Sequence, residues 1–416
     1  MRIAVVGAGV SGLVAAHQLD RDHDVHVFEA GDWVGGHTHT VDVETEHGPV
    51  AVDTGFIVLN DRNYPLFERL LAHLDVPTQP APMSFSVADE DGTFEWSSGS
   101  VNGVFACRSH VVDPEFHRML RDLLRFQREA RGLIGLNGSG PSLGDWLDES
   151  GYSRAFVERL IVPQASAVWS ADPQQMLSFP ASFLAEFFEN HGQLGLRRRP
   201  RWRAVTGGSA RYVERLTASF RERIHTATPV EWVARHADDV ELKARGHEPQ
   251  RFDHVVLALH SDQALRILRD PSEREREILS AIPYQPNDVV LHTDRTLLPR
   301  RRRAWASWNF HLLEDPPSRT TVTYDMNRLQ ALDSPEQFCV TLNRTEQIDP
   351  RRVVGRWTYD HPVFTRAGVA AQARHAEISG VRRTHYCGAY WGWGFHEDGV
   401  QSALRACEPF GRGEIE

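Results

Sequence analysis

The feature that most constrains the fold is a short apolar run that leads directly into a glycine-rich loop at the start of the chain. Residues Ile3 to Val6 are uninterruptedly apolar, which is typical of a strand buried on both faces of a parallel sheet. Glycines follow at positions 7, 9 and 12 and lead into a helical pattern. In such a loop the first glycine permits the tight turn, the second lets the backbone approach a pyrophosphate, and the third packs helix on strand. A second strand ends at Glu29, near the spacing of an acid that binds ribose hydroxyls, so the order of elements predicts a dinucleotide-binding βαβ unit.

Composition narrows the class of protein. The 416 residues, 41% of them hydrophobic and 25% charged, allow a large core and about two domains. No apolar stretch reaches the roughly 20 residues of a membrane-spanning helix, and the opening residues leave no room for a signal peptide. The net charge of −10 argues against a general nucleic-acid binder. Four widely spaced cysteines fit a reducing cytoplasm, where we expect the protein to reside.

Hydrophobic patterns along the chain alternate between strands and helices. A β-hairpin is expected from Thr38 to Val52, and amphipathic helices are expected at 115–134 and 143–160. Further strands are expected at 228–233, 254–259, 288–292, 320–324, 338–342 and 384–388. Two interleaved domains, each built from separate segments, explain this alternation best.

The first loop fits NAD and FAD alike, and a second glycine motif favours FAD. Gly35-Gly36-His37-Thr38 lies shortly after the acid, where a glycine pair lets a second backbone segment pass close to the pyrophosphate. With these motifs the chain resembles the superfamily of flavin-containing amine oxidases and protoporphyrinogen oxidases. Many members have an arginine where this chain has His37. The resemblance implies noncovalent FAD, and Cys387, which precedes the glycine of the last strand, is expected to be buried rather than tethered to the flavin.

Three further stretches continue the resemblance. Asp53 to Phe56 is similar to the family segment beside the flavin ring, Val230 to the strand that meets adenine, and Gly388 to Ser402 to the C-terminal flavin motif. More closely, Asp53 to Asn60 and Gly394 to Gly399 resemble a bacterial subfamily of predicted NAD/FAD-binding oxidoreductases. That subfamily often lies near cyclopropane-fatty-acid-synthase-like methyltransferases, which implies a lipid connection for the group. The expected cofactor-binding residues are Gly7, Ala8, Gly9, Val10, Ser11, Gly12, Glu29, Ala30, Gly35, Gly36, His37, Thr38, Gly55, Phe56, Val230, Gly388, Asp398, Gly399 and Val400.

These motifs define the expected fold, which is of the α/β class. We expect a glutathione-reductase-type FAD-binding Rossmann domain made of residues 1–60, 204–265 and 360–416. An α+β substrate-binding domain made of residues 61–203 and 266–359 is interleaved with it.

The C-terminal motif also predicts a helix end aimed at the cofactor. Asp398, with Gln401 three residues later, is interpreted as a helix cap. The amides of Gly399 and Val400 would then be free. The resemblance to the superfamily implies that they face the flavin, where they would stabilise the negative charge that gathers when a flavin accepts a hydride.

Aromatic residues before this cap are the candidates for substrate contacts. Tyr390, Trp393 and Phe395 either wall a substrate cleft or pack between the domains. His396 is a candidate general base, with Glu397 a comparable candidate, and structural roles remain open for both.

Two other kinds of site are disfavoured. His37 and His39 lack further ligands at suitable spacing, so no metal site is expected. Many related amine oxidases use a lysine near the flavin, but the only lysine here, Lys243, lies in a polar stretch that indicates an exposed hairpin.

The leading hypothesis is an FAD-dependent oxidoreductase (oxidase, dehydrogenase or desaturase) that takes a hydride from a hydrophobic substrate such as a fatty-acyl chain. Phe179, Phe183, Phe187 and Phe188 would form an apolar wall or else domain core. The alternatives are a flavin amine oxidase and, outside enzymes, a lipid-binding protein on the fold of the GDP-dissociation inhibitors. The arginine-rich runs 197–203 and 300–303 predict either solvated loops or peripheral docking on an anionic membrane, at the inner face.

Overall fold

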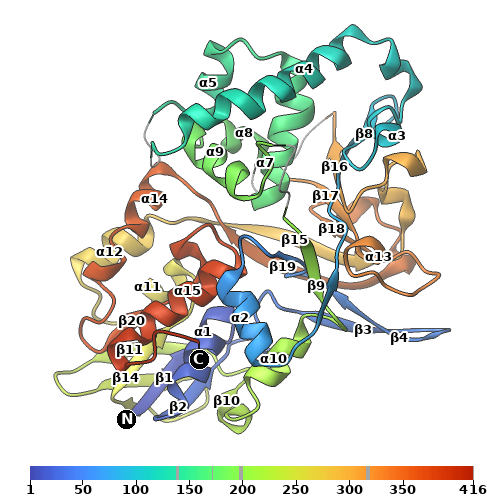
Figure 1. The fold of residues 1–416 in the computed structure, drawn as a ribbon. Coiled ribbons are helices and arrows are strands. Elements are labelled where there is room, and N and C mark those ends of the chain that lie inside the picture. The colour runs from blue at the N-terminus through green and yellow to red at the C-terminus, as the bar shows by residue number, and fades with distance from the viewer. Residues whose placement is uncertain (137–139, 171, 196–199, 315–318, 416) are drawn as a thin grey trace.

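The computed structural model describes residues 1–136, 140–170, 172–195, 200–314 and 319–415. In Figure 1 a Rossmann-type layer lies at the bottom, a long mixed sheet crosses the middle, and a helical layer lies at the top. None of the described helices combines the length and the apolar character needed to cross a bilayer.

A five-stranded parallel sheet forms the base of the molecule, in the order β10-β2-β1-β14-β20. Its strands are β1 (Arg2–Val6), β2 (Asp24–Phe28), β10 (Ile224–His225), β14 (His254–Leu257) and β20 (Thr384–Tyr386). Helices α1 (Val10–Leu19), α10 (Ala210–Leu216) and α15 (His396–Cys407) bury their apolar side chains in one core with Ile3 and Val256. Central strands buried on both faces explain why the first strand is a continuous apolar run.

A seven-stranded sheet, in the order β19-β15-β18-β17-β16-β7-β8, supports the second half of the molecule. Its strands are β7 (Phe85–Asp89), β8 (Glu95–Ser97), β15 (Tyr284–His292), β16 (Trp308–Leu312), β17 (Val322–Asp325), β18 (Cys339–Leu342) and β19 (Val353–Pro362). Only the β16–β7 pair is parallel. Segments far apart in the sequence thus build one sheet. The division into two domains by residue range stays a prediction.

The helical layer covers one end of this sheet (Figure 1). It comprises α4 (Pro114–Glu129), α5 (Leu143–Glu149), α6 (Arg154–Phe156), α7 (Val162–Trp169), α8 (Pro173–Leu177) and α9 (Ala181–Asn190) around an aromatic core. The single helix predicted for 143–160 is wrong. The chain leaves the helix at Ser150, Gly151 adopts a positive φ of 68°, and the Ser153 side chain caps a new helix by accepting from the Phe156 N–H.

Shorter elements join these layers. The predicted hairpin is present as β3 (Thr40–Thr45) and β4 (Gly48–Asp53). Two small sheets are made of β5 (Leu59–Asn60), β9 (Trp202–Val205) and β6 (Thr78–Pro80), and of β11 (Val230–Arg235), β12 (Val240–Ala244) and β13 (Gln250–Phe252). The remaining α-helices are α2 (Pro65–His73), α3 (Val101–Val104), α11 (Ser261–Ile267), α12 (Glu273–Ser280), α13 (Met326–Leu329) and α14 (Arg366–Gln372).

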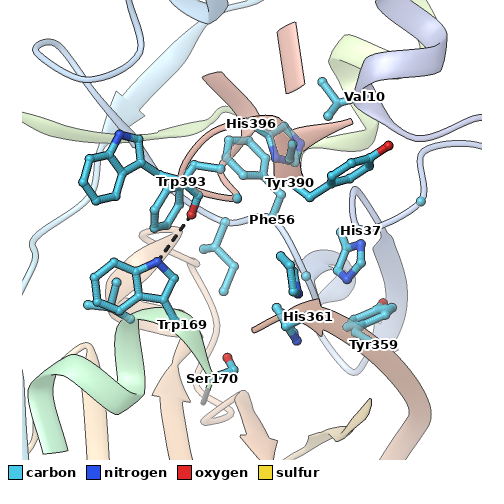
Figure 2. Close-up of a pocket in the computed structure, with 18 of the residues that line it drawn as sticks. Val10, His37, Phe56, Trp169, Ser170, Tyr359, His361, Tyr390, Trp393 and His396 are labelled. Carbon is cyan, nitrogen blue, oxygen red and sulfur yellow. Dashed lines mark hydrogen bonds between the residues drawn. The ribbon is translucent and has the colours of Figure 1, made fainter. Parts of the chain in front are cut away.

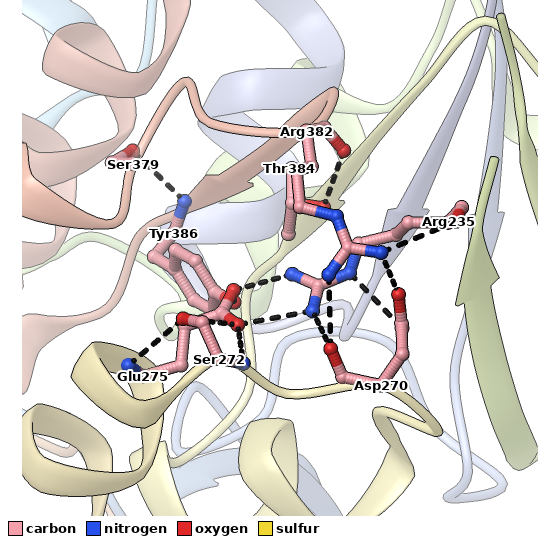
Figure 3. Close-up of polar contacts among 8 residues, drawn as sticks. All are labelled: Arg235, Asp270, Ser272, Glu275, Ser379, Arg382, Thr384 and Tyr386. Atoms are coloured by element: carbon pink, nitrogen blue, oxygen red, sulfur yellow. Dashed lines mark hydrogen bonds and ion pairs between the residues drawn. The ribbon is translucent and has the colours of Figure 1, made fainter. Parts of the chain in front are cut away.

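A buried ionic cluster fixes the end of strand β20 (Figure 3). The Arg235 guanidinium on β11 pairs with Glu275 at the start of α12, and the Tyr386 hydroxyl donates to the same carboxylate. Only 1% of the Arg235 side chain and 4% of the Glu275 side chain are exposed. Asp270 adds a second acid at 3.2 Å from Arg235 and also pairs with Arg382. Because Tyr386 comes just before Gly388, this cluster holds the backbone that enters the candidate site.

Candidate active site

One large cavity extends from the carboxyl ends of the parallel strands to the helical layer. Its volume is about 1180 Å³, above the roughly 300–1,000 Å³ of most small-molecule pockets, so it has room for a cofactor and a substrate together. Figure 2 shows Val10 and His396 at its upper end and Trp169 and Ser170 toward the helical layer. Ligands of parallel α/β sheets bind at this edge of the strands.

The first glycine loop leaves open space where a dinucleotide would lie. Gly7 adopts a φ of 103°, and an added Cβ at Gly12 would lie 2.0 Å from the Gly7 carbonyl oxygen, so both positions require glycine. Gly9 lines the cavity and is the N-cap residue of helix α1. Because glycine has no side chain, it leaves the first backbone N–H groups of the helix uncapped. An added Cβ at Gly9 would meet nothing within 4 Å. The N-terminus of α1 therefore opens onto vacant room beside its free backbone amides.

The second glycine motif packs directly against the first. The Gly35 N–H donates to the Ala8 carbonyl oxygen at 2.8 Å, and an added Cβ at Gly36 would lie 3.0 Å from the Gly9 Cα. Glu29 lines the cavity, and its carboxylate accepts from the Ala8 N–H at 2.7 Å. The acid thus supports the loop as well as facing the cavity.

The C-terminal helix begins three residues earlier than the sequence predicted. Helix α15 starts at His396, so Asp398 is in its first turn and accepts from the Phe395 N–H at 2.9 Å. Burial raises the pKa of Asp398 to about 6. The predicted cap at Asp398 is wrong. The Gly399 N–H is also not free, because it donates to the Phe395 carbonyl oxygen at 3.1 Å within the helix, and the exposed amides of this turn precede it.

Gly399 has a different use, which is to bring two helix N-termini together. An added Cβ at Gly399 would lie 2.7 Å from Val10 Cγ1 and 3.0 Å from Ser11 Oγ. Only glycine lets the start of α15 approach the start of α1 this closely. Two positive helix ends therefore converge on one end of the cavity.

His396 is locked in place by the protein. Its ring stacks on Phe56 with centroids 3.5 Å apart, and its Nε2 lies 2.9 Å from Thr38 Oγ1 and 3.1 Å from the Tyr212 hydroxyl. Burial lowers the pKa of His396 well below its usual value, so the ring is neutral. Two hydroxyl groups surround Nε2, an arrangement that orients the ring. The role of general base stays a prediction.

Glu397 caps another helix. Its carboxylate oxygens accept from the backbone N–H groups of Leu66 at 3.0 Å and Phe67 at 2.9 Å, in the first turn of α2. It is not among the described residues that line the cavity. The structure thus gives Glu397 a contact that stabilises α2, and its catalytic role stays a prediction.

Most other predicted site residues face the cavity. These are Gly7, Gly9, Val10, Ser11, Glu29, Ala30, Gly35, Gly36, His37, Gly55, Phe56, Val230, Gly388, Tyr390, Trp393, Phe395 and His396. Six lie behind the lining and support it, namely Ala8, Gly12, Thr38, Asp398, Gly399 and Val400. Lys243 on β12 donates to the His247 carbonyl oxygen and stays outside the cavity lining, and Cys387 is buried, where burial raises the pKa of its thiol.

A group of polar rings in the cavity was not predicted. His37, His260 and His361 line it, and the His37 ring centroid lies 5.3 Å from that of His361 and 6.4 Å from that of His260. Burial lowers the pKa of His37 and of His260 to about 4, and of His361 to about 3. These neutral rings come from three distant segments, so no spacing in the sequence could have revealed them. The described residues contain no cluster of histidine, cysteine and acidic side chains suited to a metal ion.

The part of the cavity inside the helical layer is here called the apolar arm, because apolar side chains line it. It is lined by Leu123, Phe126, Leu160, Val168, Trp169, Phe187 and Phe188. Gln164 and Gln193, joined by a 2.7 Å hydrogen bond, add a neutral polar patch. The carboxylates among the described lining residues are Glu29 and Asp360, and neither is in the arm. Phe179 and Phe183, predicted as either wall or domain core, lie in the core behind the arm.

Comparison with known proteins shows which family the chain belongs to. The sequence model of the family described as flavin containing amine oxidoreductase matches residues 10–409. Over 40 residues the chain is 55% identical to the flavin-dependent L-tryptophan oxidase RebO of Lentzea aerocolonigenes, a match that covers 9% of this chain and 8% of that protein. A putrescine oxidase structure shares the fold with a TM-score of 0.71 and 15% identity, over 99% of both chains. A fatty acid isomerase from P. acnes that produces CLA matches with a TM-score of 0.69 and 16% identity, over 98% of both chains.

Proposed function

The chain belongs to the family of flavin-containing amine oxidoreductases and is an FAD-dependent oxidoreductase, and on that premise we propose that it takes a hydride from a hydrophobic substrate, such as a fatty-acyl chain or another lipid. FAD supplies the hydride acceptor. The substrate, and every role assigned below to a named residue, is part of the proposal.

The glycine end of the cavity fits FAD. The space beside Gly9 would hold the pyrophosphate, with the adjoining backbones of Gly9 and Gly36 lining it. Glu29 would bind the ribose hydroxyls, and Val230 would meet the adenine through its backbone. The space directly beside Gly9 is open, because an added Cβ there finds no neighbour within 4 Å.

Several groups of the chain would then assist the reaction. The convergent N-termini of α1 and α15 favour negative charge, each by about 0.3–1 kcal/mol at exposed sites and more when buried. Neutral His37 and His361 can each donate or accept one hydrogen bond at the cavity wall without introducing a charge. The aromatic rings of Trp393 and Phe395 exclude water from the space in front of α15.

The observation that carries the substrate proposal is the apolar arm. Its lining combines aliphatic and aromatic side chains with neutral glutamines, and no described arm residue is acidic. A cationic amine would lose its hydration there without gaining an opposite charge, whereas an acyl chain gains by burying apolar surface.

Amine oxidation is the second candidate, and the family assignment favours it. The likeness in fold to putrescine oxidase supports it no more than the likeness to the fatty acid isomerase supports a lipid, because both structures share under a fifth of their residues with this chain. Lys243, the only lysine, lies outside the cavity lining, so an amine oxidase on this scaffold would work without a lysine beside the flavin.

The motif from Gly394 to Gly399 supports a finer placement, in the bacterial subfamily of predicted NAD/FAD-binding oxidoreductases. Four of its residues make different contacts. His396 lies within hydrogen-bond distance of Thr38, and the Glu397 carboxylate caps α2. Asp398 accepts from the Phe395 N–H, and Gly399 lacks the side chain that would clash with the start of α1. A motif in which these residues contribute to one joint between α15, α1 and α2 is a suitable subfamily marker.

The arginine-rich runs give little support to membrane docking. Residues 197–199 lie outside the described residues. In the second run Arg301 pairs with buried Glu95 at 3.0 Å, and Arg300 and Arg303 donate to backbone carbonyl oxygens. The arginines of the second run therefore make contacts within the protein.

Anaerobic reduction of the purified holoprotein tests the proposal. The visible flavin band is followed while long-chain acyl compounds or primary amines are added without oxygen. Bleaching by the acyl compounds supports the proposal, and bleaching by amines alone replaces it with the second candidate.

A further inference from the structure

Exposed large hydrophobic side chains are concentrated on and around the outer face of helix α4. Ten large hydrophobic side chains are exposed among the described residues, and six of them lie between positions 101 and 136. Val111 is 52% exposed and Val112 81% exposed just before α4, Leu124 is 60% exposed at its middle, and Ile134 is 41% exposed just after it. Such concentrations of exposed apolar side chains mark interaction sites.

The same face carries positive charge. His117, Arg121, Leu124 and Arg128 are exposed and are spaced by four, three and four residues, which places them on one side of the helix. Within the described residues Arg118 and Arg121 form no ion pair, and Arg128 has only a 3.7 Å contact with its neighbour Glu129. On a chain with a net charge of −10, this basic side is a local reversal of sign.

The inner face of α4 belongs to the cavity. Leu123 and Phe126 line the apolar arm and Gln127 lines the same cavity, whereas Leu124 faces the solvent. Figure 1 shows α4 along the top edge of the molecule, at the end opposite the Rossmann sheet. A single helix thus separates the arm from the basic, partly apolar surface.

We propose that this surface, made of Val111, Val112, the outer side of α4 and Ile134, docks on an anionic lipid bilayer. A helix with basic residues and exposed aliphatic side chains on one side lies in the plane of a membrane interface, with the aliphatic groups in the acyl boundary and the arginines at the anionic headgroups. The arm would then lie just behind the helix that touches the lipid.

A second copy of this chain is the less favourable occupant. A twofold interface pairs a surface with itself, so it would bring the arginines of one α4 against those of the other. Acidic headgroups complement the same charges. The inference does not require a lipid substrate, because lipid binding is measured without turnover.

Vesicle sedimentation of the holoprotein tests this inference. The wild-type protein should sediment with vesicles of phosphatidylglycerol and phosphatidylcholine, remain in solution with phosphatidylcholine alone, and bind less as salt is raised. Arg121→Gln/Arg128→Gln should weaken binding roughly 25-fold, because each arginine contributes about five-fold. Val111→Ser/Val112→Ser should weaken it several-fold by removing the apolar contact.

The matched control is Arg274→Gln/Arg276→Gln, which changes the net charge equally at two exposed positions of α12, a helix that shares a hydrophobic core with β1. It should leave vesicle binding unchanged, and all variants should keep the wild-type flavin spectrum and melting temperature. Equal binding of the wild type to both vesicle types, or equal loss in the α4 and α12 variants, would overturn the proposal. So would a wild-type dimer in light scattering that Arg121→Gln/Arg128→Gln dissociates without any vesicle binding. A protein that binds anionic vesicles yet is reduced only by amines keeps this inference and loses the substrate proposal.

Discussion

The Nε2 atom of His396 lies 2.9 Å from the hydroxyl oxygen of Thr38. This contact joins the first turn of the last helix to the second glycine motif, across almost the whole length of the chain. The contact connects the motif near residue 396 to the loops of the proposed cofactor site that begins at residue 7.

His396→Ala should remove the joint without removing a catalytic proton acceptor. Loss of the stacking on Phe56 and of the hydroxyl partners should lower the free energy of unfolding by about 2–3 kcal/mol and weaken FAD binding. The rate of flavin reduction should keep the shape of its pH profile in rapid-mixing experiments. If the variant loses one limb of that profile while it retains FAD, His396 is a general base after all.

Two glycine substitutions should separate cofactor binding from folding. Gly9→Val should give a folded apoprotein that fails to bind FAD, because its φ of −75° suits any residue and its side chain enters the vacant space. Gly12→Val should fail to fold stably, since its Cβ would lie 2.0 Å from the Gly7 carbonyl oxygen. Thermal unfolding of the apoproteins and FAD titration measure both effects. Normal FAD affinity in Gly9→Val would remove the pyrophosphate from this space.

The buried cluster in Figure 3 should be worth far more than a surface ion pair. Glu275→Gln removes the more buried of the two carboxylates that pair with Arg235, so the free energy of unfolding should fall by about 3–5 kcal/mol. The control Glu158→Gln breaks an exposed pair with Arg154 and should cost at most about 1 kcal/mol. Urea unfolding monitored by fluorescence compares the two variants, and equal costs would contradict the account of the cluster.

Stability should fall as the pH is lowered from 7.5 to 5. The pKa values of His37, His260 and His361 are about 4, 4 and 3 in the folded protein, below the value near 6.5 of an unfolded chain. The unfolded state therefore takes up their protons first, and stability is lost as the pH falls below about 6.5. Asp53 and Asp398, whose pKa values burial raises to about 6, oppose this trend because the folded state protonates them first.

The variant His37→Gln/His260→Gln should flatten this dependence. Each histidine should account for on the order of 1 kcal/mol between pH 7.5 and 5. Melting temperatures across this range measure the slope. A double variant with the wild-type slope would show that these rings are not neutral and buried as the structure describes.

The sequence predicted the parts of the site that depend on local backbone geometry. Gly7, Gly12 and Gly36 each sit where a side chain would clash or where φ is positive, and such positions leave a direct trace in the sequence. The fold class is confirmed, as is membership of the flavin amine oxidase superfamily.

What the sequence could not predict depends on contacts between distant segments. The sequence pattern indicates a helix cap at Asp398, but Phe395 is the N-cap residue in the structure. Asp398 lies in the first turn and accepts from the Phe395 N–H. Glu397 gave no sign that it caps a helix more than 300 residues earlier. His260 and His361 lie near His37 only in the folded structure. The neutral arm likewise depends on the packing of distant segments and not on a spacing of residues in the sequence.

The most direct test of the account is anaerobic flavin reduction in a protein whose apolar arm has been filled. Val168 lines the arm, so Val168→Trp should retain FAD but lose most of its reduction by long acyl chains. Val354→Trp, at a position on β19 that is 39% exposed, is the control and should behave as the wild type. The account predicts bleaching of the visible flavin band by acyl substrates in the wild type and control, and little bleaching in Val168→Trp. Bleaching of the wild type by amines alone, or equal bleaching by acyl chains in all three proteins, would contradict it.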